Sequence, residues 1–117
     1  MARLAYVIKF VADMDRGVAF YSETFGFPVK MKTPFWSELD TGETVLALHP
    51  ASDANPAGSC QLGFNLDDLQ GFYERGAVEF SAPPREQHGT LLARMIDCEG
   101  AEVSLSGLGP HSIVRSA

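Results

Sequence analysis

The side chains best suited to chemistry are His49 and Glu38, which fall on two neighbouring extended segments of the sequence. A neutral imidazole can bind a metal ion or accept a proton, and a positioned carboxylate can also transfer a proton. Both are therefore candidate catalytic residues. The alternative for His49 is a strand-end residue, before Pro50, that is exposed or hydrogen-bonded to backbone. The alternative for Glu38 is a solvated position on a strand.

Aromatic residues accompany these polar groups. Trp36 shares a strand face with Glu38, because alternate residues of a strand point the same way. With Phe35 and Tyr6, it can form an aromatic wall for a planar or cationic ligand. The alternative places these rings in the core or in a dimer interface.

The second half of the chain offers fewer candidates. Arg94 can pair with an anionic ligand or with a carboxylate such as Glu38, and the alternative is a surface salt bridge. His88 lies in a proline-containing loop, and His111 lies in a C-terminal tail expected to be loosely ordered. Cys60 and Cys98 lack the spacing of a redox motif or zinc knuckle, so both are expected to be buried or half-buried free thiols.

Composition narrows the partners. The 117 residues carry a net charge of −6, and their nine Lys and Arg are scattered, which argues against nucleic acid. No apolar run approaches the roughly 20 residues of a membrane helix. The N-terminus does not have the pattern of a signal peptide, so the expected location is cytoplasmic.

The first half of the chain predicts a strand, a helix and three strands. Asp13 is expected to cap the helix, whose apolar stripe ends at Gly26. Lys9 falls on the helix-packing face of the first strand, which requires either an extended stem or a different register. The predicted strands are 4–11, 28–32, 35–40 and 43–49.

The second half repeats this plan after a polar linker at 50–59. Asp67 or Asp68 caps a short helix that ends at Gly76. The predicted strands are 60–66, 78–81, 91–97 and 102–106, with a loop at 82–89. We therefore expect one domain with module one at 4–49, the linker, module two at 60–107 and a tail at 108–117.

Three segments carry a family resemblance: V-A-D-M-D-R-G-V-A-F-Y-S-E-T-F-G-F, T-G-E-T-V-L-A-L and D-C-E-G-A-E-V-S-L. In combination they resemble the vicinal oxygen chelate superfamily, which includes glyoxalase I, bleomycin-resistance proteins and extradiol dioxygenases. The resemblance implies an α+β fold of two βαβββ modules, whose mixed sheet curls around a cleft. It also implies a homodimer, and a loop at 82–89 of the kind that often closes over the cleft.

Metal-dependent members of that superfamily place His or Glu on the first and last strand of each module. The resemblance puts these positions at Tyr6, Ala47, Gln61 and Ser104. An alanine methyl cannot bind a metal, and serine and tyrosine are poor ligands for a divalent ion. We therefore expect no metal cofactor, although a displaced site using His49 with Glu38 or Gln61 is an open alternative.

The sequence thus predicts a protein that binds a small, partly aromatic molecule without the usual metal. The expected ligand-binding residues are Tyr6, Trp36, His49, Gln61, Arg94 and Ser104. The alternative is a lyase, isomerase or dioxygenase-type enzyme with an atypical metal site or a metal-free acid–base site, in which His49, Glu38 or Tyr6 would transfer protons. A cleft filled by side chains would instead indicate a purely structural domain.

Overall fold

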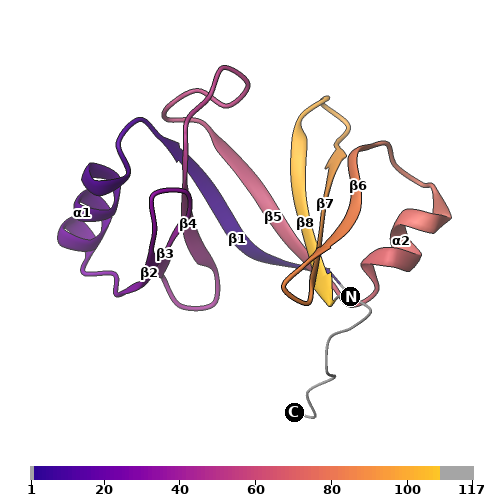
Figure 1. Ribbon diagram of the computed structural model, residues 1–117, viewed down its shortest axis with the longest axis horizontal. Helices are drawn as coiled ribbons and strands as arrows, with labels where there is room; N and C mark the ends of the chain where they lie inside the picture. Colours follow the sequence, from indigo (N-terminus) through magenta and orange to yellow (C-terminus); the bar gives the residue numbers. More distant parts are fainter. Residues whose placement is uncertain (1, 109–117) are drawn as a thin grey trace, which may run out of the picture. The chain divides into compact units, whose positions relative to one another are not determined.

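The computed structural model describes residues 2–108, which form two compact units. The first unit is Leu4–Leu62, and the second comprises residues 63–108 together with residues 2–3. Each contains strands and one helix in the order of a βαβββ module (Figure 1). The predicted α+β class and the repeated module are confirmed.

The first unit arranges four strands in the order β2-β3-β4-β1. Strands β2, β3 and β4 are antiparallel, whereas β4 and β1 are parallel because α1 connects β1 to the rest of the module. The elements are β1 (Ala2–Val11), α1 (Met14–Phe25), β2 (Val29–Lys32), β3 (Ser37–Asp40) and β4 (Val45–Pro50).

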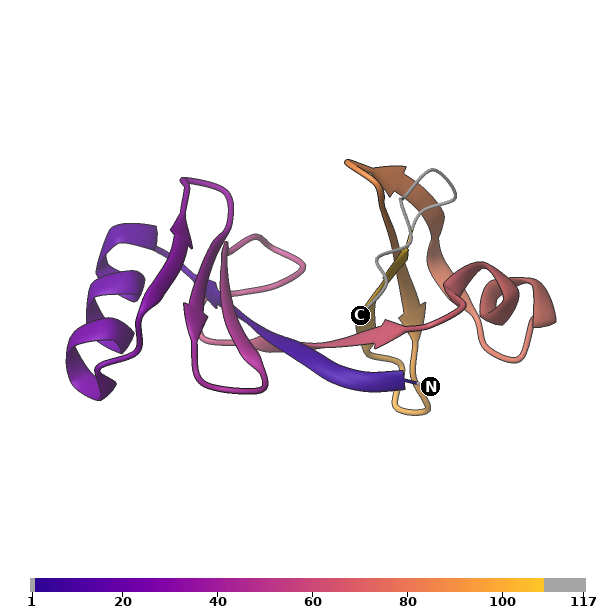
Figure 2. The same cartoon turned by 90° about the horizontal axis from the view of Figure 1, so that it is seen from below.

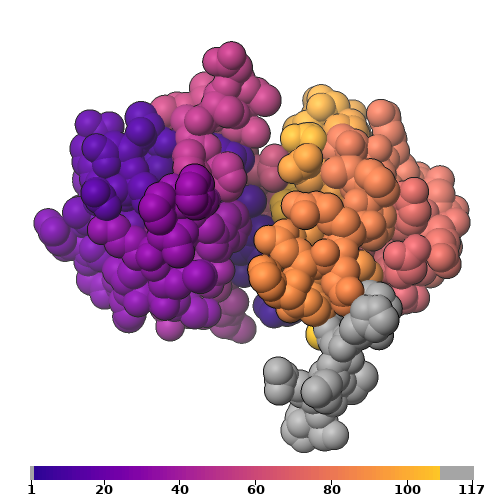
Figure 3. Space-filling view, viewed as in Figure 1, coloured from indigo at the N-terminus to yellow at the C-terminus, as the bar shows by residue number. Residues whose placement is uncertain are grey.

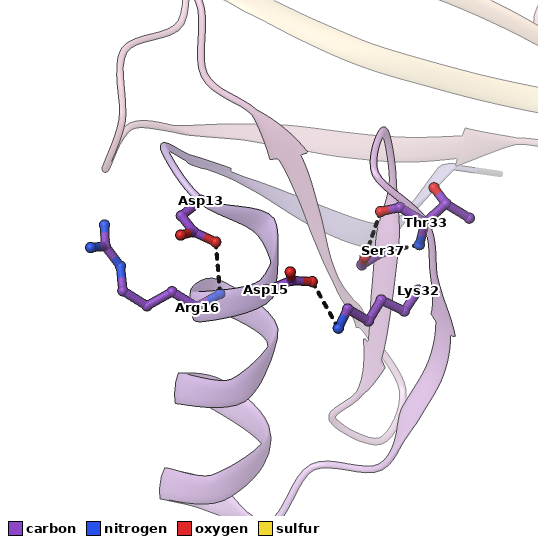
Figure 4. A network of polar contacts seen from close by, with 6 residues as sticks. All are labelled: Asp13, Asp15, Arg16, Lys32, Thr33 and Ser37. Carbon is purple, nitrogen blue, oxygen red and sulfur yellow. Dashed lines mark hydrogen bonds and ion pairs between the residues drawn. The ribbon is translucent and has the colours of Figure 1, made fainter.

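Helix α1 begins and ends at the predicted residues. The Asp13 side chain accepts a hydrogen bond from the Arg16 amide at 3.0 Å, and Gly26 adopts a left-handed conformation with φ of 74°. Asp15 and Lys32 form an ion pair of 2.9 Å between α1 and β2 (Figure 4). Because both side chains are largely exposed, this pair contributes little to stability.

The two faces of the first sheet differ in what they contact. Helix α1 lies along one face of β2–β4 (Figure 2), where its Val18 packs against Leu39 and Leu48. The opposite face carries Ile8 and Ala47. The alternation predicted for these strands is therefore observed.

Lys9 was predicted to need either an extended stem or a different strand register, and the structure shows the extended stem. The register pairs it with Leu48, so the strand assignment holds. Its ammonium group donates a hydrogen bond of 2.8 Å to the carbonyl oxygen of Gly58, and the extended stem therefore carries the charge past the apolar face to a loop.

The loop between β4 and the next strand, β5 (Cys60–Leu66), is tied to β1 by backbone hydrogen bonds. The Ala51 amide donates to the Val11 carbonyl, and the Gly58 amide donates to the Phe10 carbonyl, each at 2.8 Å. The Phe10 amide donates in turn to Ser59 at 3.0 Å. The segment predicted as a linker is thus held at both ends, and it protrudes from the first unit (Figure 3).

The second unit repeats the arrangement as β5-β8-β7-β6, with β5 and β8 parallel. Asp68, rather than Asp67, accepts the capping bond from the Gly71 amide, and Gly76 ends the helix with φ of 65°. Its core gathers around Leu69, Leu91 and Leu105. The elements are β5 (Cys60–Leu66), α2 (Leu69–Arg75), β6 (Phe80–Gln87), β7 (Thr90–Ile96) and β8 (Glu102–Leu108).

The prediction of a loop at 82–89 was wrong. These residues belong mostly to β6, which is antiparallel to β7, and only His88 and Gly89 turn the chain, with φ of 54° and 82°. Proline lacks an amide donor, but β6 is the outer strand of its unit and its register shifts around Pro83 and Pro84. His88 therefore lies in a tight hairpin turn and not in the predicted eight-residue loop at 82–89.

Both cysteines are exposed, contrary to the expectation of burial. Cys60 is the first residue of β5, and Cys98 lies in the turn before β8, so neither reaches a core. Across residues 2–108, no helix is long and apolar enough to cross a membrane. His111 and the remainder of the predicted tail beyond Leu108 lie outside the described residues.

Candidate functional site

The face of the first sheet that is turned away from α1 holds a row of side chains across four strands. Cross-strand pairing joins Met31 to Glu38, Glu38 to Ala47, and Ala47 to Ile8. Ala47 is fully buried, whereas Met31 is 44% exposed at the edge of the sheet. The row therefore runs from the buried side chains of Ile8 and Ala47, past the Glu38 carboxylate, to the exposed side chain of Met31.

Aromatic rings gather above Ala47. The Trp36 ring lies 6.2 Å from the Tyr6 ring and 6.3 Å from the His49 imidazole, with interplanar angles of 77° and 78°. Tyr6 and Trp36 both pack against the cluster that contains Ala47. The small alanine leaves room for the two rings to approach, and edge-to-face geometry is favourable for aromatic pairs.

Glu38 is fixed by the same indole. The Trp36 Nε1–H group donates a hydrogen bond of 2.8 Å to Glu38 Oε2, and both side chains are half-buried. A hydrogen bond to a carboxylate is stronger than one between neutral groups. This bond therefore sets the orientation of the ring and holds a negative charge at its edge.

His49 is exposed at the other side of Trp36 and lies 5.5 Å from the Phe10 ring. Its Nδ1 atom is 2.8 Å from the carbonyl oxygen of Pro50. Because a carbonyl only accepts, Nδ1 is the donor, and Nε2 is the acceptor nitrogen of the neutral ring. This contact agrees with the alternative that His49 is an exposed strand-end residue hydrogen-bonded to backbone. It uses only Nδ1, so Nε2 is the nitrogen that could accept a proton or a hydrogen bond.

The other predicted residues lie on β5, β7 and β8. Gln61 is 8% exposed on the first part of β5. Arg94 pairs in register with Ser104, and its Nε lies 3.3 Å from Glu102 Oε2, which also accepts a hydrogen bond from Ser81. The surface ion pair considered for Arg94 is thus formed with Glu102. The structure groups Tyr6, Trp36, Glu38 and His49 in the first unit, while Arg94 and Ser104 belong to the second.

Two open grooves lie beside the helices, away from these residues. One follows the start of α1, and its lining includes Asp13 and Phe20. The other lies between the end of α2 and β6, and its lining includes Tyr73 and Phe80. Neither contains a predicted site residue, and Asp13 is already engaged as a helix cap. The sheet face of the first unit is therefore the better candidate, because aromatic and charged groups converge there.

Comparison with known proteins places the chain in a family. Residues 3–101 match the model of the Glyoxalase/Bleomycin resistance protein/Dioxygenase superfamily. The chain belongs to this superfamily. The resemblance noted in the sequence is confirmed, and no curated protein was found to match.

Solved structures support the fold of this superfamily member. A hypothetical protein from Bacillus halodurans C-125 is 13% identical, with a TM-score of 0.72 over 97% of this chain and 99% of that one. A glyoxalase/bleomycin resistance protein/dioxygenase superfamily member from Vibrio splendidus 12B01 is 12% identical, with a TM-score of 0.68 over 92% and 99%. Methylmalonyl-CoA epimerase from Streptomyces coelicolor is 18% identical, with a TM-score of 0.66 over 97% and 98%.

The residues at the metal-binding positions of the superfamily do not fit a divalent ion. Ala47 offers no donor atom and is fully buried, while Tyr6 and Ser104 offer only hydroxyl groups and Gln61 an amide. Within residues 2–108, no group of three or more His, Cys, Asp or Glu side chains is placed to hold a metal.

Sequence reasoning missed Met31. A strand was predicted at 28–32, and β2 is Val29–Lys32, but the residues on each face of this strand were not assigned. The sequence feature that could have placed Met31 on this face is the turn at Thr33-Pro34, because a hairpin at that turn pairs Met31 with Glu38. The Phe35 side chain is 76% exposed in the single chain, so it does not pack in a core, while its place in a dimer interface stays a prediction.

Proposed function

We propose that this superfamily member binds a small aromatic molecule, without a metal ion, on the open sheet face of its first unit. The observation that carries the proposal is the environment of Trp36. Its ring makes edge-to-face contacts with both Tyr6 and His49, and its indole N–H is bonded to Glu38. Such an arrangement offers stacking surface and a fixed polar group, which are the usual components of a small-molecule site.

The charge of the site favours a cationic aromatic ligand. Aromatic faces attract cations, and the Glu38 carboxylate adds a full negative charge beside Trp36. The chain has a formal net charge of −6, which also attracts cations and repels anions. We therefore infer a preference for an aromatic ring that carries a positive group.

Acid–base catalysis is less well supported by the same geometry. Glu38 is bonded to the Trp36 indole, and His49 is bonded to the Pro50 carbonyl, so the two candidate bases have separate partners. A nucleophile or base in a catalytic pair is generally oriented by the other member of that pair. Binding is accordingly the function that this arrangement supports best.

The chain contains one tryptophan, so its fluorescence reports directly on the proposed site. We would titrate the protein with benzyltrimethylammonium and with neopentylbenzene, an uncharged molecule of the same shape. Saturable quenching is expected, with the cation bound roughly 3- to 30-fold more tightly, the range given by a cation–π contribution. Absence of saturable quenching by either probe would contradict the proposal.

The metal-free part of the proposal has its own test. Purified protein would be dialysed and its metal content measured by mass spectrometry, in parallel with the fluorescence titration. We expect no stoichiometric divalent ion, and we expect a chelator to leave the affinity for benzyltrimethylammonium unchanged. A retained equivalent of metal whose removal abolishes binding would contradict this part while leaving the aromatic site in place.

The proposed assembly is a homodimer, as membership of the superfamily leads us to expect. Sedimentation velocity over a range of protein concentrations would measure the mass in solution. A monomer at all concentrations would remove the dimer from the proposal without affecting the site on the first unit.

A further inference from the structure

The turn that leads into Trp36 is organised by one hydroxyl group. Thr33 Oγ1 accepts hydrogen bonds from the Trp36 amide at 2.9 Å and the Phe35 amide at 3.2 Å. The same hydroxyl donates to the Trp36 carbonyl at 2.7 Å. A hydroxyl has one donor and two acceptor positions, so this one is fully used, and all its partners are backbone groups at or beside Trp36.

The surrounding bonds show that the hydroxyl takes a role usually filled by backbone. In a common four-residue turn, the first carbonyl accepts from the fourth amide. Here the Thr33 hydroxyl accepts from the Trp36 amide, and the Thr33 carbonyl accepts from Ser37 Oγ at 3.3 Å (Figure 4). Ser37 is fully buried beneath the turn, so the hydroxyl contacts are anchored to the sheet.

Besides the hydroxyl contacts, the turn is closed by one backbone hydrogen bond, which the Thr33 amide donates to the Trp36 carbonyl at 3.1 Å, and the same amide lies 3.4 Å from Ser37 Oγ. Pro34 has no amide hydrogen to donate, and Phe35 at the tip is 76% exposed. The indole ring is fixed at its far end by Glu38, whereas the backbone of Trp36 is fixed at Thr33. The orientation of the ring over Ala47 therefore depends on both contacts.

We propose that Thr33 is a positioning residue for the ligand site, acting through the backbone of Trp36. This inference rests on the proposed function, because it concerns the same aromatic face. Thr33 itself is not among the residues proposed to contact the ligand. Its hydroxyl holds Trp36 in the conformation that the ligand meets, so that less ordering is required on binding.

The test compares Thr33→Val, which has nearly the same shape but no hydroxyl, with Thr33→Ser, which keeps the hydroxyl. The matched control is Thr41→Val, because the Thr41 hydroxyl donates to the Thr44 carbonyl in the other hairpin of the first unit. Affinity for benzyltrimethylammonium would be measured by calorimetry. We expect Thr33→Val to weaken it by roughly 3- to 10-fold, the effect of one or more lost hydrogen bonds, with Thr33→Ser and Thr41→Val near the wild-type value.

A second readout does not require any ligand. Fluorescence anisotropy and acrylamide quenching of Trp36 would be measured in the free protein. Thr33→Val should lower the anisotropy and raise the quenching, and Thr33→Ser should restore both. Unchanged values in a folded Thr33→Val protein would overturn the inference. If wild-type protein binds neither aromatic probe, the proposed function fails, while these measurements still decide whether Thr33 orients Trp36.

The test also covers the case in which a Thr33 variant does not fold. Should Thr33→Val fail to fold, Thr33→Ala would be measured in its place, because alanine removes the hydroxyl without adding a methyl group at the turn. Folded Thr33→Ala with a mobile Trp36 would support the inference. Failure of both variants to fold would overturn it, because the turn would then be required for the fold itself.

Discussion

The two units have the same order of elements but different chemistry on the corresponding sheet positions. In the first unit, Ala47 on the last strand is covered by Tyr6 and Trp36, with Glu38 beside it. In the second unit, the equivalent strand presents Ser104 and Ser106, and Ser106 accepts a hydrogen bond from Asn65 at 3.1 Å. The repeated caps and glycines maintain the scaffold, whereas these strand positions are where the two modules have diverged.

This difference shows that the scaffold and the site depend on different residues. Asp13 with Gly26, and Asp68 with Gly76, do the same work in both units at the ends of the helices. None of these four residues faces the aromatic group above Ala47. Substitutions at the caps should therefore lower stability similarly in both units. Substitutions at corresponding sheet positions should have different effects in the two units.

The largest difference between the two units is expected when glutamate, one of the ligands that the resemblance implies for metal-dependent members, is introduced on each last strand. Ala47→Glu places a carboxylate in a fully buried position under Tyr6 and Trp36. We expect it to lower the free energy of unfolding by about 2–4 kcal/mol, because the site must be overpacked or must bury an unpaired charge. Ser104→Glu, at a half-buried position, should cost no more than about 1 kcal/mol. Urea denaturation would measure the free energy of unfolding of both variants. Equal decreases would contradict the proposed difference between the two units.

The next effect concerns binding. Trp36→Leu removes the central ring of the proposed site and should weaken benzyltrimethylammonium by roughly 10- to 30-fold, the effect of losing an aromatic anchor. Arg94→Leu, in the second unit, should leave the affinity unchanged. Isothermal calorimetry is suitable for both because the first variant lacks the fluorophore. A larger effect of Arg94→Leu would move the site, or part of it, to the second unit.

Removing the helix N-caps should have a similar effect on stability in both units. Asp13→Ala and Asp68→Ala each remove one capping hydrogen bond of 3.0 Å. Each should reduce the free energy of unfolding by about 1 kcal/mol, the usual effect of losing such a cap. Thermal denaturation followed by circular dichroism measures the two losses. A negligible loss at Asp68 would indicate that the short helix α2 is held by its packing on Leu69 alone.

The smallest effect concerns charge. Glu38→Gln keeps an oxygen that can accept from Trp36 Nε1 but removes the negative charge. The advantage of benzyltrimethylammonium over neopentylbenzene should fall by roughly 2- to 5-fold, which corresponds to an exposed ionic contribution. Glu102→Gln in the second unit is the matched control and should leave the advantage intact. At high salt the same advantage should shrink more in the wild-type and Glu102→Gln proteins, which keep Glu38, than in Glu38→Gln.

Features encoded locally were predictable from the sequence. The caps at Asp13 and Gly26, the alternation of β4 and the repeat of the module all depend on residues close together in the chain. The face shared by Trp36 and Glu38 followed from the two-residue period of a strand. These local rules predicted the two modules, whereas the superfamily was suggested by the resemblance of three motif segments.

Features that depend on partners in other strands were less accessible. The strand predicted at 78–81 was too short, and most of β6 was predicted as a loop because its prolines disfavour a strand. Only the position of β6 at the edge of the unit makes these prolines tolerable. The bond between Lys9 and Gly58 joins residues 49 positions apart, so no local pattern indicates it. The approach of Tyr6 to Trp36 depends on the size of Ala47, which lies on a third strand.

The prolines of β6 also bear on self-association through strand edges. An outer strand with free amide and carbonyl groups can template a further strand and so promote aggregation. Pro83 and Pro84 remove two consecutive donors from β6, and β2, the outer strand of the first unit, carries Lys30 and Lys32. The outer edge of each unit therefore resists the addition of strands from other molecules, which should help keep the protein dispersed at high concentration.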